Sequence, residues 1–222
     1  MKILILGHPR CGSGFSAYYL NLLGLNISHE NTELKCLDEF DGLSNWGFTI
    51  KHSPNDNIFP RWGMYGDDWR KICHFDKRIV HIRNPFNSFD AIIHENRCVE
   101  SYRIRKQYIH NVLGKEIVGN ELERAILCYL YWYEILLNDC DFHFRLEYDL
   151  DKLTDYIKKN VKENINTIEN TEINTKVNTK QRGDNQSKIT KTDYLNIRKD
   201  ILEQLNDFCV RLGYCTFEQH FS

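Results

Sequence analysis

The first twenty residues, MKILILGHPRCGSGFSAYYL, constrain the fold more than any other stretch of the chain. An apolar run with β-branched residues at positions 3 and 5 ends at Gly7, and an apolar stretch of helical character begins near Ser13. The segment therefore predicts a buried strand, a tight loop and a helix. Glycines at positions 7, 12 and 14 give the backbone room to turn and to approach a ligand, and the first amides of a helix attract anions. The loop predicts a phosphate-binding site.

This loop differs from a nucleotide P-loop at one important position. Gly7 and Gly12 have the G-x-x-x-x-G spacing of a Walker A loop, but Ser13 and Gly14 stand where that loop continues with Lys and then Ser or Thr. The basic residue lies inside the loop instead, at Arg10. A strand-to-helix turn that binds no ligand is the structural alternative.

A basic residue followed by a small residue, Gly and then Ser or Thr resembles the 5′-phosphosulfate loop of the sulfotransferase family. These enzymes use 3′-phosphoadenosine 5′-phosphosulfate (PAPS) as donor and release 3′,5′-adenosine bisphosphate (PAP). The loop also has features of the cysteine phosphatases, but Ala17 stands where those enzymes need an arginine, so we interpret Cys11 as a small loop residue. The sulfotransferase resemblance implies a donor site without a metal, made of Arg10, Cys11, Gly12, Ser13, Gly14, Phe15 and Ser16.

A second match follows a strand predicted at 47–51. Aligned on proline, His52-Ser53-Pro54 resembles a Lys-Thr-His-Leu-Pro-like segment of soluble sulfotransferases, and His52 takes the place of their catalytic base. Such a group is needed because the acceptor hydroxyl loses its proton as it attacks sulfur, and imidazole titrates near working pH. A surface histidine at a strand end is the alternative. Glu95 is a second candidate for the base, since some sulfotransferases use a glutamate.

A third match lies at the end of a strand predicted at 78–82. The strand continues into Arg83-Asn84-Pro85 and a helix, which resembles the sulfotransferase signature whose arginine, with a serine eight positions later, binds the 3′-phosphate of PAPS. Arg83 matches that arginine, but Ala91 stands at the eighth position, and Ser88 is our candidate replacement. A salt bridge at a sheet edge is the alternative role for Arg83.

The composition changes over 158–193, where Asn, Thr, Lys and Glu dominate and aromatic residues are absent. Low hydrophobicity predicts a mobile segment, which would serve either as a linker or as a lid. Sulfotransferases have a basic loop here that folds over the nucleotide. By this resemblance, Arg182 and Gly183 are candidate donor contacts.

Other stretches bear mainly on the fold. Apolar patterns predict helices over 122–137 and 201–212, and a last strand over 142–146. The stretch from residue 26 to Trp46 is polar and irregular. Within it, His29-Glu30 and Asp41 to Trp46 resemble segments of some bacterial sulfotransferase-like proteins, a resemblance that assigns no role to either segment.

Composition excludes several classes of function. The 29 lysines and arginines nearly balance the 31 aspartates and glutamates, so nothing indicates a nucleic-acid or membrane-surface binder. The eight cysteines are scattered without zinc spacing, as in a reduced cytoplasmic protein. Pro9 and Arg10 interrupt any signal peptide, and the apolar stretch 125–133 is too short to cross a bilayer. We therefore expect a cytoplasmic protein without a membrane span.

Together these patterns predict one α/β domain over 1–222, with three layers, a mainly parallel central sheet and the P-loop-like fold of sulfotransferases. The expected reaction moves a sulfuryl group from PAPS to an acceptor hydroxyl on a glycan or a small molecule. A P-loop small-molecule kinase and a catalytically inactive nucleotide-binding protein are the alternatives. The sequence identifies neither the acceptor nor the oligomeric state.

Overall fold

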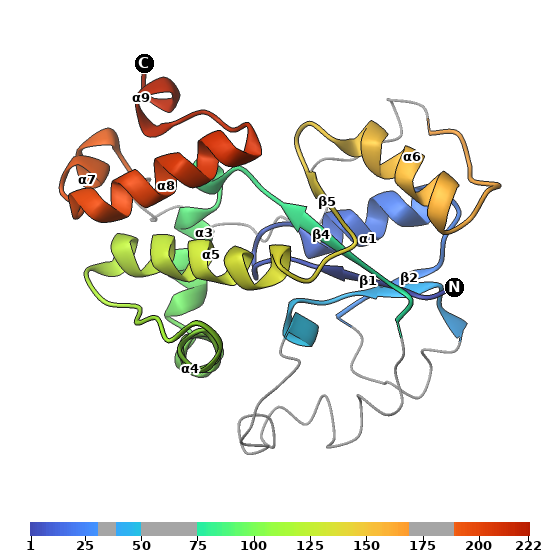
Figure 1. Ribbon diagram of the computed structural model, residues 1–222, viewed down its shortest axis with the longest axis horizontal. Helices are drawn as coiled ribbons and strands as arrows, with labels where there is room; N and C mark the ends of the chain where they lie inside the picture. Colours follow the sequence, from blue (N-terminus) through green and yellow to red (C-terminus); the bar gives the residue numbers. More distant parts are fainter. Residues whose placement is uncertain (31–38, 50–74, 169–188) are drawn as a thin grey trace. The chain divides into compact units, whose positions relative to one another are not determined.

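The apolar run at the start of the chain is the central strand of a parallel sheet. β1 (Ile3–Leu6) is buried along its whole length and pairs in parallel with β3 (Gly42–Ser44) and β4 (Lys77–Ile82). β2 (Ile27–His29) and β5 (Phe142–Arg145) complete the order β2-β3-β1-β4-β5 (Figure 1). A central parallel strand is covered on both faces, which explains why β1 is continuously apolar rather than alternating. The predicted α/β class with a parallel sheet is confirmed.

The computed structural model describes residues 1–30, 39–49, 75–168 and 189–222. The chain divides into two compact units, and each is made of two stretches. The first unit comprises Met1–Ile82 and Leu136–Thr179, and the second comprises Arg83–Ile135 and Lys180–Ser222. The single domain predicted from the sequence stays a prediction.

In the first unit, α1 (Ser13–Leu22) and α6 (Leu150–Asn160) cover one face of the sheet (Figure 1). The two helices touch each other, because Tyr19 Oη lies 2.8 Å from Thr154 Oγ1. Their apolar sides meet the strands in one buried cluster, which contains Ile3, Ile5, Leu20, Ile79, Phe144, Leu153 and Ile157.

The second unit is helical in its described part. It contains α3 (Phe89–Asn96), α4 (Val99–Leu113), most of α5 (Glu121–Leu137), α7 (Lys191–Leu195), α8 (Lys199–Leu212) and α9 (Phe217–His220). α5 and α8 are the helices predicted over 122–137 and 201–212. α8 ends at Leu212, and Gly213 caps it with a φ of 69°.

The strand predicted at 47–51 is wrong in its described part. Trp46–Thr49 form a short 3₁₀ helix, labelled η2, in which the Gly47 amide donates to the Asn45 side chain over 2.8 Å. This local hydrogen bond favours a turn over an extended strand. The strand that pairs with β1 lies earlier, at Gly42–Ser44. A side chain at Gly42 would collide with the Ile3 carbonyl, so glycine permits this close pairing.

The segment 158–193, predicted to be mobile, is described by the structure only towards its two ends. Within the stretch 158–193, Lys158 to Asn160 form the last turn of α6 and Lys191 to Asp193 begin α7, so both ends are helical. Residues 169–188 lie outside the described ranges. In the described parts of the chain, no helix has the length and apolar character needed to span a membrane.

Candidate functional site

The loop between β1 and α1 has an unusual backbone conformation at two residues. Gly12 precedes α1 with a φ of 105°, and Arg10 adopts a left-handed φ of 69°. Glycine takes such a conformation readily, whereas arginine does so at an energetic cost. Strain at a non-glycine residue tends to occur at functional sites. The half-buried Arg10 is therefore held in the loop in a conformation that its own backbone disfavours.

The start of α1 offers backbone donors to an anion. The first amides of a helix, here those of Ser13, Gly14 and Phe15, have no acceptor within the helix. Gly12, at the N-cap position, has no side chain that could accept a hydrogen bond from these amides. The first turn of the helix contains no acidic residue. Nothing within α1 itself therefore competes with an anion for these donors or repels it.

Two close contacts explain why the loop needs glycine. The ring of His81, on β4, lies so near the backbone of Gly7 that any Cβ there would collide with it. A Cβ at Gly12 would likewise collide with the side chain of Leu146. Leu146 is held in place because Arg145 and Asp149, on either side of it, form a two-bond ion pair of 2.7 and 3.0 Å. The glycines therefore allow the loop to pack against β4 and against the residue that follows β5.

Other loop residues turn their side chains away from solvent. Cys11 and Ser16 are completely buried, and the Ser16 hydroxyl donates to the Gly12 carbonyl over 3.2 Å. Phe15 packs on the core and stacks with Tyr19 at a ring separation of 6.3 Å. Among the polar side chains of the loop, those of Arg10 and Ser13 are half-buried and so partly reach solvent.

Ser13 contacts a histidine that comes from another strand. Its Oγ lies 3.0 Å from Nε2 of His29, the last residue of β2, and the same nitrogen lies 3.8 Å from Glu30 Oε1. The buried Ser44, at the end of β3, donates from its hydroxyl to the Ser13 carbonyl over 2.9 Å. The ends of β2 and β3 therefore fix the beginning of α1.

His81 is the most strongly perturbed imidazole in the described part of the first unit. Burial lowers the pKa of His81 to about 3, with a smaller contribution from the nearby His29. The ring is therefore uncharged at neutral pH and packs against Gly7 as a neutral group.

The residues predicted to bind the 3′-phosphate, Arg83 and Ser88, lie at the beginning of the second unit. The half-buried Arg83 follows β4 directly, and its carbonyl accepts a hydrogen bond from Tyr129 Oη. Asn84 caps the 3₁₀ turn Pro85–Asn87 by accepting from the Phe86 amide over 3.0 Å. Ser88 is completely buried and donates to the Asn84 carbonyl over 2.9 Å. The hydroxyl of Ser88 thus stabilises this turn, while its predicted phosphate contact stays a prediction.

Glu95 belongs to a polar network that joins α3 to α4. Its Oε1 accepts from the Ser101 hydroxyl over 3.1 Å and lies 3.9 Å from Arg105 Nη1. Arg105 is completely buried, and it also donates to Ser101 over 2.6 Å and to Asn96 over 2.8 Å. This arrangement gives Glu95 a structural role beside a buried guanidinium. Its catalytic role stays a prediction.

Three predicted site residues, His52, Arg182 and Gly183, lie outside the described residues. Among the residues that the structure does describe, no three His, Cys, Asp or Glu side chains are grouped to hold a metal ion.

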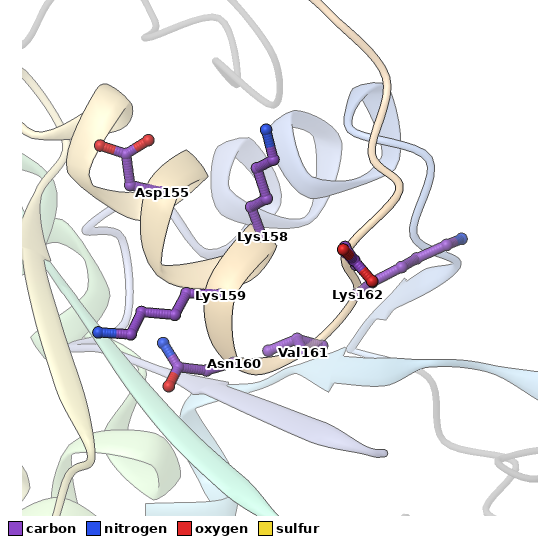
Figure 2. A pocket seen from close by; sticks show the side chains of 7 residues that line it. Asp155, Lys158, Lys159, Asn160, Val161 and Lys162 are labelled. Carbon is purple, nitrogen blue, oxygen red and sulfur yellow. The ribbon is translucent and has the colours of Figure 1, made fainter.

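A surface depression of about 580 Å³ lies at the end of α6 and is lined by Asp155 and by residues 158–163. Figure 2 shows that Lys158 and Lys159 point in different directions, so their ammonium groups do not converge on one ligand. Lys162 donates to the Gly24 carbonyl over 2.7 Å. Lysines at a helix C-terminus complement the helix dipole, which explains this cluster without a ligand.

Comparison of the chain with protein-family models, with curated proteins and with solved structures finds no significant match. The site consequently depends on its own geometry. The contact between Ser13 and His29 was missed from the sequence, because the two residues are 16 positions apart and only strand pairing brings them together. The single available signal was the segment His29-Glu30, which carried no role.

Proposed function

We propose that this protein is a PAPS-dependent sulfotransferase. The observation that supports the proposal best is the β1–α1 loop, in which an uncapped helix N-terminus, a left-handed Gly12 and the strained Arg10 occur together. An anion with several oxygens matches such a set of donors. The absence of a Walker lysine after Gly12 favours a phosphosulfate over a nucleoside triphosphate as the ligand.

The proposed reaction is an in-line displacement at sulfur. The acceptor oxygen forms a bond to sulfur while the bond from sulfur to the bridging phosphate oxygen breaks, and PAP leaves with the electron pair. His52 takes the proton of the acceptor hydroxyl, with Glu95 as the second candidate. Arg10 and the first amides of α1 stabilise the negative charge on the sulfuryl group and on the departing phosphate. By the resemblance, Arg83, Ser88, Arg182 and Gly183 contact the 3′-phosphate side of the donor.

Thermal unfolding with two nucleotides tests this proposal. PAP at one hundred times its Kd adds about 2.7 kcal/mol of stability, which corresponds to a rise in Tm of about 5–10 °C. We expect no such rise with ATP and Mg²⁺. Stabilisation by ATP and Mg²⁺ but not by PAP would identify the kinase alternative instead.

A matched pair of arginine variants locates the binding. Arg10→Ala should weaken PAP binding by about tenfold or more, because it removes a charge-assisted hydrogen bond. Arg78→Ala is the control: Arg78 lies near the opposite end of the sheet, in β4, and pairs with Asp139 over 2.7 Å. It should leave PAP affinity unchanged. Equal losses in the two variants would show that PAP does not bind at the loop.

Turnover separates an enzyme from an inactive binder. We expect transfer of a radiolabelled sulfuryl group from PAPS to an acceptor in extract of the source organism. Transfer should be lost in His52→Ala if His52 is the base, and in Glu95→Ala if Glu95 is. If PAP binds and transfer persists in both variants, neither residue is the base. PAP binding without transfer to any acceptor would support the inactive nucleotide-binding protein.

A further inference from the structure

The hydroxyl group of Ser13, in the β1–α1 loop, contacts a side chain that lies outside the loop. One nitrogen of His29, Nε2, lies 3.0 Å from Ser13 Oγ and 3.8 Å from the Glu30 carboxylate. The side chains of His29 and Glu30 are 29% and 43% exposed, so an ion and the solvent proton pool can both reach the pair. A titratable ring is therefore in direct contact with the candidate anion site.

The contact is fixed by three separate elements. His29 pairs with Ser44 in the register of β2 and β3, and the Glu30 amide donates to the Ser44 carbonyl over 3.1 Å. The Ser44 hydroxyl in turn holds the Ser13 carbonyl. Ser44 thus determines the positions of both partners, which makes their 3.0 Å contact a built feature rather than a chance approach of surface side chains.

The position of the ring proton decides what Ser13 can do for an anion. If Nε2 carries no proton, it accepts the hydrogen of the Ser13 hydroxyl, and Ser13 Oγ then presents only lone pairs to a ligand. If Nε2 carries a proton, it donates to Ser13 Oγ, and the hydroxyl hydrogen is left for an anion oxygen. The nearby Glu30 carboxylate favours the protonated Nε2. Imidazolium, which has a proton on both nitrogens, always leaves the hydroxyl in its donating state.

The same geometry argues against Ser13 as a nucleophile. In a Ser-His-acid arrangement the acid holds the ring nitrogen that does not face the serine. Here the carboxylate and the hydroxyl both lie near Nε2. Glu30 therefore favours a proton on Nε2, where the ring donates to Ser13 Oγ rather than accepting the Ser13 proton.

We propose that His29 is a positioning residue of the anion site: it donates from Nε2 to Ser13 Oγ, directs the Ser13 hydroxyl toward a sulfate-type anion, and thereby links anion binding to proton uptake. This inference rests on the proposed function only in placing an anion at the β1–α1 loop.

The charged and titratable groups near His29 come from its own strand end, from the loop, from β4 and from α1. The Glu30 carboxylate lies 3.8 Å from the ring, and Arg10 belongs to the loop itself. His81, on β4, remains neutral between pH 6 and 8 because burial lowers its pKa to about 3. The buried His8 donates from Nδ1 to the Pro9 carbonyl over 2.8 Å. α1 adds Tyr18 and Tyr19, where burial raises the pKa of Tyr19, and β3 adds the non-titrating Ser44.

Inorganic sulfate is the probe for this inference, because it remains a dianion from pH 6 to 8, whereas the phosphates of PAP titrate in that range. Sulfate affinity is measured from the change of Tm with sulfate concentration at constant ionic strength, at pH 6 and at pH 8. For the wild-type protein we expect affinity to rise up to about tenfold on going to pH 6, the worth of one hydrogen bond to a charged group. His29→Gln keeps an amide donor without a charge and should remove this rise.

A double-mutant cycle shows whether His29 acts through Ser13. Ser13→Ala should lower sulfate affinity and flatten its pH profile, and adding His29→Gln to Ser13→Ala should change nothing further. The control Arg78→Ala should keep the wild-type profile. A wild-type pH profile in His29→Gln, or fully additive losses in the double variant, would overturn the inference.

The outcome separates the two proposals. Binding of PAP together with a sulfate profile that is independent of His29 would leave the sulfotransferase proposal intact and overturn the inference. A sulfate profile that depends on His29, in a protein that does not bind PAP, would support the inference and overturn the sulfotransferase. Failure to bind either anion would overturn both.

Discussion

At the scale of single residues, His81 shows how burial decides the state of a titratable group. Its side chain is only 1% exposed and fills the space that the missing side chain of Gly7 leaves beside β1. Burial lowers the pKa of His81 to about 3, so the folded protein keeps the ring neutral at any pH above that value. In the unfolded chain the same ring titrates near its ordinary pKa of about 6.5.

This difference predicts a loss of stability in mild acid. Between pH 6.5 and pH 3 the unfolded chain binds a proton that the folded protein does not, so the free energy of unfolding falls as pH falls. From pH 7 to pH 5, His81 should account for about 2 kcal/mol of lost stability. Urea unfolding at the two pH values measures it. His81→Leu, which keeps an apolar side chain of similar size, should lose that much less.

The variant isolates His81, because every other titrating group is common to both proteins. If His81→Leu loses as much stability between pH 7 and pH 5 as the wild-type protein, the folded state must accept a proton at His81, and its neutral packing against Gly7 would be refuted. The sequence could not predict this pairing. The pattern RIVHIR indicates a strand, but only the parallel register of β1 and β4 brings residue 81 to Gly7.

At the scale of elements, the sequence predicted those that are long or strongly patterned. β1 with its glycine loop, α5 and α8 have clear apolar patterns and defined ends, and all three were found. β2 and β3 have three residues each, too few for a periodic signal, and Gly42 reads as a turn residue although it begins β3. Such strands form because a neighbouring strand pairs with them, which is information from the tertiary structure.

The missed strands change the interpretation of the site. The sequence placed His52 at the end of a strand at 47–51, but residues 46–49 form a 3₁₀ helix, so this support for His52 as the base is lost. The histidine that the structure places at the end of a strand beside the loop is His29. The argument that a histidine at a strand end belongs to the site was made for His52 but applies to His29. The role we propose for His29 is to position Ser13, not to act as the base.

The pair of helices α3 and α4 gives a prediction about Glu95. Glu95→Ala removes the carboxylate near the completely buried guanidinium of Arg105, at 3.9 Å, and it removes the acceptor of the Ser101 hydroxyl. We expect the free energy of unfolding to fall by about 2 kcal/mol, less than for a fully buried ion pair, because the Glu95 side chain is 25% exposed. Chemical denaturation measures this loss.

Glu121→Ala is the matched control, since Glu121 pairs with Arg97 where both side chains are more than half exposed. It should cost less than about 1 kcal/mol. Adding Arg105→Met to Glu95→Ala should restore part of the stability, because no buried charge then remains. An equal loss in the two single variants would mean that the network contributes no more than a surface ion pair, and a loss of transfer in Glu95→Ala could then be attributed to chemistry.

At the scale of the whole molecule, neither compact unit is continuous in sequence. The chain passes from one to the other at 82–83, at 135–136 and at 179–180. Each folded unit therefore holds the two ends of a stretch that belongs to the other unit close together. When one unit unfolds, these ends separate and the entropic benefit of the closed loop is lost. The candidate loop belongs to the first unit, and the predicted 3′-phosphate residues Arg83 and Ser88 belong to the second.

This connectivity predicts that the two units unfold together, as a single domain would. The thiols of Cys11 in the first unit and Cys128 in the second are both completely buried, so their reaction with a thiol reagent reports local opening in each unit. We expect both thiols to become reactive at the same urea concentration.

Ile157→Ala, in the core of the first unit, should cost about 3 kcal/mol and lower both midpoints equally. Peptide mass spectrometry of the labelled protein resolves the two sites. If Ile157→Ala exposes Cys11 while Cys128 stays protected, the units unfold independently, and the single domain predicted over 1–222 must be divided in two.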